Sequence, residues 1–129
     1  MSLDVPATML ERAEAGEVED ADFLAVVRNS LPYAYELISG VVDQLMSGVA
    51  PFADNEVPPP SEAERGQLLR ALASDAIRGS LERHFGVRLA FQNCHRVAAF
   101  REPLDVRAYS AFTSPRAQIL NQSPLLRDC

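Results

Sequence analysis

The chain has 129 residues and a net charge of −6, and it contains no run of about 18 apolar residues, so we expect a single soluble domain over 1–129 without a membrane span. All twelve basic residues are arginines. Without a lysine amine, Schiff-base chemistry, pyridoxal phosphate anchoring and a P-loop are excluded. Two cysteines do not make a disulfide framework, and the start "MSLDVPATML" lacks a secretory leader, which predicts a cytoplasmic protein.

The charge is unevenly distributed along the chain. Residues 1–58 carry eleven acidic side chains and two arginines, a net charge of −9, whereas residues 59–129 carry seven acidic side chains and ten arginines, a net charge of +3. We expect the two halves to face each other, within one subunit or between subunits. The acidic balance argues against nucleic acid as a partner, because phosphate contacts dominate that affinity.

Helical periodicity dominates the first half. Helices are predicted over 4–16, 18–30 and 30–48, each with a polar or acidic start, and the first and third end near a glycine. The Pro-rich stretch 50–60, "APFADNEVPPP", is predicted to be the loop that joins the two helical halves. Asp54 and Glu56 within it are too few oxygen ligands for a hard cation.

The strongest predicted element is a helix over 61–85. Ser61 and Glu64 form a capping box, apolar residues then recur at helical spacing, and Gly86 follows the last turn. A helix of this length would span the domain, so it is expected to be the central helix of a mainly α bundle. Small residues along it, Gly66, Ala73 and Gly79, would allow close approach of a second copy and favour a homodimer.

The segment 87–101 fits two structures. Its apolar residues alternate as in a strand, yet Phe91, Cys94 and Val97 also obey helical spacing. We favour a small β-hairpin that turns at 93–95, because the helix before it ends at Gly86. Two short helices are predicted after it, over about 102–112 and 114–121, and residues 122–129 are expected to form a tail.

The two histidines and two cysteines are the candidate residues for catalysis or metal binding. His84, Cys94, His95 and Cys129 are candidate metal ligands, and His84 is a candidate base for a Cys94 thiolate. Their spacing matches no zinc pattern, and the adjacent Cys94 and His95 would point in different directions on a strand or a helix. We therefore expect a structural, buried Cys94 and an exposed Cys129, with no catalytic residue and no cofactor.

The stretches "VRNSLPYAYELISG", "FADNEVPPPSEAERGQLLRALASDAIRGSLERHFGVRLAFQNCHRVAAF" and "LNQSPLLRDC" resemble a family of small conserved cytoplasmic proteins found in streptomycetes and related actinobacteria. The resemblance covers nearly the whole chain and is weakest over 101–113. It implies a bacterial cytoplasmic protein, and it brings no known activity or site residue to this chain.

Together these observations favour a non-catalytic interaction or regulatory protein, a homodimer with a further protein partner that the sequence does not identify. The alternative is a thiol- or metal-dependent protein that uses Cys94 with His84 or Cys129.

Overall fold

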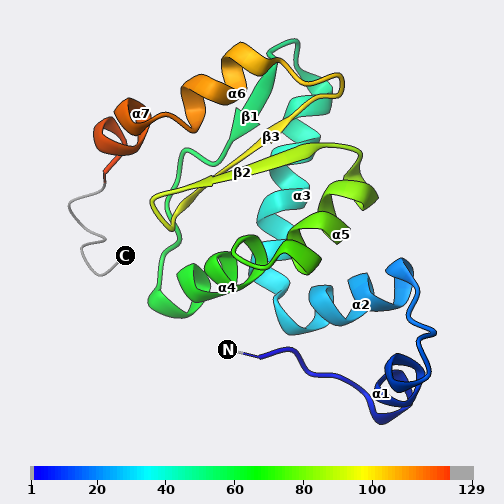
Figure 1. The fold of residues 1–129 in the computed structure, drawn as a ribbon. Helices are drawn as coiled ribbons and strands as arrows, with labels where there is room; N and C mark the ends of the chain where they lie inside the picture. Colours follow the sequence, from blue (N-terminus) through cyan, green and yellow to red (C-terminus); the bar gives the residue numbers. More distant parts are fainter. Residues whose placement is uncertain (1, 123–129) are drawn as a thin grey trace.

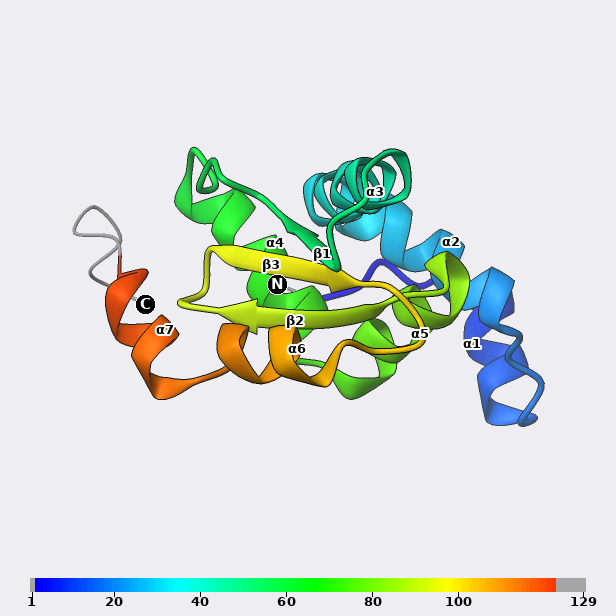
Figure 2. The ribbon, with the colours of Figure 1, turned by 90° about the horizontal axis from the view of Figure 1, so that it is seen from above.

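The computed structural model of the protein describes residues 2–122 and begins with three helices. They are α1 (Ala7–Glu14), α2 (Asp20–Ser30) and α3 (Pro32–Ser47), close to the ranges that periodicity predicts. Helix α1 buries none of its residues and lies at the periphery in both views of the ribbon (Figures 1 and 2). Val27 of α2, Ile38 of α3 and Leu31 between the two helices enter the core, each at most 1% exposed.

The predicted central helix is two helices, α4 (Glu62–Leu72) and α5 (Asp75–Phe85), so the bundle around one long helix is wrong. Ser61 is confirmed as the N-cap of α4, since the Glu64 amide donates to Ser61 Oγ at 3.2 Å, and the Ser61 hydroxyl also contacts Glu64 Oε1 at 3.2 Å. A second cap causes the break, because Ser74 Oγ accepts from the Ile77 amide at 3.3 Å and begins a new helix. The turn lets Leu68 and Leu81, on separate helices, both enter the core without any exposure.

Three antiparallel strands complete the fold: β1 (Phe52–Asp54), β2 (Arg88–Gln92) and β3 (Arg96–Phe100), in the order β1-β3-β2. The predicted hairpin is confirmed, and its turn covers residues 93–95. Strand β1 lies inside the stretch expected to be loop and pairs with β3, Phe52 opposite Phe100. Two short helices, α6 (Val106–Phe112) and α7 (Pro115–Leu120), follow as expected; residues 123–129, most of the expected tail, lie outside the described residues.

Both faces of the sheet are covered. One face, here called the aliphatic face, joins the main core under α2 to α5 through Ala53, Leu89, Val97 and Ala99. The opposite face, here called the aromatic face, packs with α6 through Phe52, Ala90, Ala98 and Phe100. In Figure 1, α6 lies above the strands and α4 and α5 lie below them. The near-continuous apolar run 97–100 is therefore that of a strand buried on both sides.

Among the residues that the structure describes, ion pairs join the acidic first half to the arginine-rich second half at two places. Arg83 on α5 binds both carboxylate oxygens of Asp20 at the start of α2, at 2.8 and 3.0 Å. Arg96 on β3 reaches Asp54 on β1 at 2.7 Å. Among residues 2–122, no helix is long and apolar enough to cross a membrane.

Candidate functional site

Within residues 2–122, the structure does not bring His84 to Cys94 and His95. His84 is exposed at the end of α5, where its Nε2 lies 3.4 Å from the Tyr35 hydroxyl oxygen. Cys94 and His95 lie in the hairpin turn at the other end of β2. Five strand residues separate the two places, a span of about 17 Å. The chain does not double back after Gly86 as His84 would require to act on Cys94.

The hairpin turn contains two residues with positive φ and a histidine side chain that contacts a backbone carbonyl of the turn. Asn93 and Cys94 have φ of 54° and 50°, and His95 Nδ1 lies 2.5 Å from the Asn93 carbonyl oxygen. His95 is buried at 9% exposure, whereas Cys94 is only partly buried and disulfide-bonded, which corrects the expectation of a buried thiol. Cys129 lies outside the described residues. Within 2–122, no three histidine, cysteine or acidic side chains are grouped to hold a metal ion.

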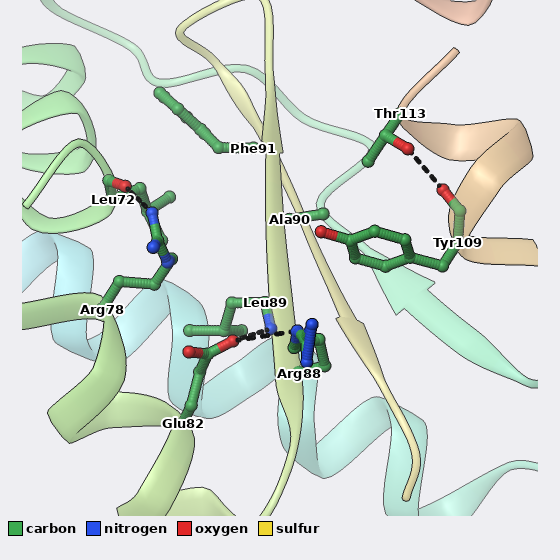
Figure 3. Close-up of a pocket in the computed structure, with 9 residues that line it drawn as sticks. All are labelled: Leu72, Arg78, Glu82, Arg88, Leu89, Ala90, Phe91, Tyr109 and Thr113. Atoms are coloured by element: carbon green, nitrogen blue, oxygen red, sulfur yellow. Dashed lines mark hydrogen bonds and ion pairs between the residues drawn. The ribbon is translucent and has the colours of Figure 1, made fainter. Parts of the chain in front are cut away.

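A cleft of about 550 Å³ lies instead along β2, between α5 and α6 (Figure 3). We call it the β2-edge cleft; its lining is Leu72, Arg78, Glu82, Arg88, Leu89, Ala90, Phe91, Tyr109 and Thr113. Figure 3 shows Arg78 and Glu82 on the α5 side, Tyr109 and Thr113 on the α6 side, and the strand between them. Because β2 is an edge strand of the sheet, the cleft gives access to one row of its backbone groups.

The backbone of β2 is only partly occupied on this side. The Leu89 amide points away from β3 and donates to Glu82 Oε2 at 2.8 Å. Backbone groups of alternate residues in a strand point the same way, so the Phe91 amide and carbonyl share that edge. In the part of the chain that the structure describes, no side chain or loop bonds the Phe91 backbone on that side. The edge therefore has one amide capped by a carboxylate and further groups open.

Two arginines give the cleft a positive character. Arg88 is half exposed, its guanidinium carbon lies 5.6 Å from the centre of the Tyr109 ring, and its Nε is 3.9 Å from Glu82 Oε2. Arg78 donates to the Leu72 carbonyl at 3.1 Å and to the exposed Asp75 carboxylate at 2.7 Å. Both contacts with carboxylates involve partly exposed groups, which water and salt screen. The guanidiniums are therefore held in place without being buried.

Reasoning from the sequence missed this site, because its residues are of common types and come from four separate elements. Only one signal was visible, the alternation over 87–91 that predicts a strand. That the strand lies at an edge follows from its pairing with β3 alone, and β3 is central because β1 pairs on its other side.

No curated protein and no solved structure matches the chain. A family model described as "NucS shadow ORF" matches residues 1–129, the whole chain. That description names an open reading frame by its relation to NucS and states no activity, substrate or partner. The match supports the expectation of a small conserved family, and the chain belongs to the NucS shadow ORF family.

Proposed function

We propose that the protein is a non-catalytic protein–protein interaction module that binds an extended segment of its partner in the β2-edge cleft. The observation that carries this proposal is the open edge of β2 at the floor of a cleft with two walls. A partner segment would add as a fourth strand, since main-chain hydrogen bonds supply affinity and pockets for alternate side chains supply specificity. The amide and carbonyl of Phe91 and the carbonyl of Leu89 are the pairing positions, because the Leu89 amide is already bonded to Glu82.

The alternative function, thiol or metal chemistry at Cys94, has less support. His84 and Cys94 stand at opposite ends of β2, so the histidine is out of hydrogen-bond reach of the sulfur. The His95 ring nitrogen Nδ1 is engaged with the Asn93 carbonyl in the same turn. The geometry around these residues serves the hairpin turn.

Single-stranded nucleic acid is the competing occupant of the same cleft. The name of the family model begins with KH, letters that also denote an RNA-binding module whose GXXG loop clamps four backbone nucleotides. No two glycines of this chain are three residues apart, so it has no GXXG. The turn between α4 and α5 ends at Ser74, and Asp75, the first residue of α5, would repel a phosphate there. Peptide binding is the function that the residues favour.

We further propose that the module works in the cytoplasm of actinobacteria as a homodimer. The outer surface of α4 supports the dimer, because Leu69 is 49% exposed beside Gly66 and Ala73 in a shallow hollow. Light scattering at micromolar concentration should give about twice the 14.1 kDa chain mass. A single species of 14.1 kDa across dilutions would contradict it.

Selection of displayed random peptides against the full chain tests the main proposal. Selected peptides should shift the amide NMR signals of Leu89 and Phe91, whereas those of α1 should stay in place. The matched control is the same peptide N-methylated at alternate residues, which keeps its side chains but loses the strand hydrogen bonds. Equal binding by the methylated peptide, or shifts elsewhere on the surface, would overturn strand addition at β2.

A further inference from the structure

We propose that the β2-edge cleft selects an acidic peptide, and that a carboxylate of the bound segment lies between Arg78 and Arg88. This inference rests on the proposed function and adds the chemistry of the partner. Its starting point is the lining of the cleft, which contains two arginines and one acidic residue, Glu82. The lining therefore carries a net positive charge at the place where a ligand strand would lie, although the whole chain carries −6.

Glu82 shows what chemistry the edge accepts. Its carboxylate oxygen Oε2 accepts a hydrogen bond at 2.8 Å from the Leu89 amide, which points away from β3, and lies 3.9 Å from Arg88 Nε. A carboxylate is thus already accommodated between an edge amide and a guanidinium, within the cleft. A carboxylate of the ligand could bind the same two kinds of donor two residues further along β2. These donors are the Phe91 amide and the N–H groups of Arg78 and Arg88 that the protein's own acceptors leave open. Charge-assisted bonds of this kind are stronger than neutral ones.

The two arginines are also placed to act together. They line the same cleft from two elements, Arg78 from α5 and Arg88 from β2, and Figure 3 shows them on opposite sides of the strand, so that a ligand strand added at the edge would lie between them. Arg88 lies against the Tyr109 ring, which fixes the direction of the guanidinium without using its hydrogen-bond donors. Arg78 shares its donors with the Leu72 carbonyl and with Asp75, whose side chain is 93% exposed. An incoming carboxylate can displace such an exposed partner at small cost.

Three blocked heptapeptides of alternating threonine and valine test the inference, with glutamate, glutamine or lysine at the central position. Calorimetry with the full chain at low salt should show the glutamate peptide binding about tenfold tighter than the glutamine peptide, as expected for hydrogen bonds to a charged group. The lysine peptide should bind more weakly than either. The glutamate preference should shrink between 0.05 and about 0.5 M salt, because the arginines are partly exposed.

Variants assign the preference to the two arginines. Arg88→Gln and Arg78→Gln should each reduce the ratio of glutamate to glutamine affinity, and Arg88→Lys should restore part of it, since lysine keeps the charge and loses the planar fork. Arg116→Gln, an exposed arginine on α7 outside the cleft, is the matched control and should leave the ratio unchanged.

The outcomes separate the two proposals. Equal binding of the glutamate and glutamine peptides would overturn the acidic preference and leave strand addition standing. If none of the three peptides binds, both proposals fail. A single-stranded oligonucleotide that binds the cleft and shifts the Leu89 and Phe91 signals, with no effect of the glutamate peptide, would replace the peptide by nucleic acid and overturn the inference.

Discussion

The two faces of the sheet are buried by different means. The aliphatic face packs under α2 to α5, whose apolar residues come from the whole stretch 24–81. The aromatic face is covered chiefly by α6, a helix of seven residues, and by rings that contact one another. Regions with few buried contacts open at lower free energy than regions tied into the main core. Of the two walls of the β2-edge cleft, α5 is therefore the fixed wall and α6 is the wall that can adjust to a ligand.

The largest expected effect, and the strongest test of the difference between the two faces, comes from removing the side chain at the centre of the aromatic face. Phe100 is fully buried, and its ring centroid lies 5.1 Å from that of Phe52, 5.3 Å from that of Tyr109 and 6.0 Å from that of Phe112. Phe100→Ala should reduce the free energy of unfolding by about 3–5 kcal/mol, because burial, ring contacts and packing are lost together. Urea unfolding followed by circular dichroism measures the change.

Hydrogen exchange then shows where the loss is felt. In Phe100→Ala, amides of α6 should lose protection before those of α5. Val97→Ala, a smaller deletion at the fully buried Val97 on the aliphatic face of the same strand, is the matched control and should not loosen α6 selectively. Uniform loss of protection in both helices would mean that the two faces unfold as one unit.

The next largest effect concerns the seam between β1 and β3. Asn55 extends the ladder beyond β1 with its side chain: Nδ2 donates to the His95 carbonyl at 2.8 Å, and Oδ1 accepts from the Val97 amide at 2.8 Å. Asn55→Ala leaves the Val97 amide, in a fully buried residue, without this partner, which should cost about 2 kcal/mol. Asn55→Asp keeps an acceptor and should cost less. Asn29→Ala, at an exposed position on α2, should be close to neutral.

Most helices and the hairpin could be predicted from the sequence, because their signals are local. Ser61 with Glu64, Ser114 before Pro115, and Gly86 with φ of 66° each mark a helix end through their own side chain or backbone. The alternation over 87–91 and the break at Gly86 favoured the hairpin over a helix, and the structure confirms the hairpin.

The parts that could not be predicted depend on distant contacts. The helical periodicity continues through Ser74, because α4 and α5 bury residues in the same core, so the internal cap was hidden by a pattern that suits one helix or two. Strand β1 has three residues, too few for a period-2 pattern, and its identity follows from pairing with β3. The β2-edge cleft exists only once β2 is known to be an edge strand. His84 and Cys94 drew attention by their chemistry, and the fold places them at opposite ends of β2.

The smallest predicted effect lies at the edge of the main core, where Asp20 on α2 meets Arg83 on α5. The hydrogen bonds from Arg83 hold the pKa of the Asp20 carboxyl below its usual 3.8, and the nearby positive charge adds to this. The pair is well exposed, so its coupling should be small, below about 3 °C in Tm at neutral pH, and weaker in high salt. A double-mutant cycle with Asp20→Asn and Arg83→Gln isolates it from the separate benefit of an acidic residue in the first turn of α2.

The pH dependence of this coupling shows whether it comes from the ionised Asp20 carboxylate. A carboxyl whose pKa is lower in the folded state stabilises the fold fully above the unfolded value of 3.8, and the contribution disappears as the pH falls through the folded value. The coupling in the cycle should therefore be constant between pH 5 and 7 and decline only below about pH 4. Thermal unfolding of the four variants across pH 3–7 measures it. A coupling that persists at the acid end would show that it does not arise from the charge of Asp20, and a coupling that declines already at pH 6 would assign it to another titrating group.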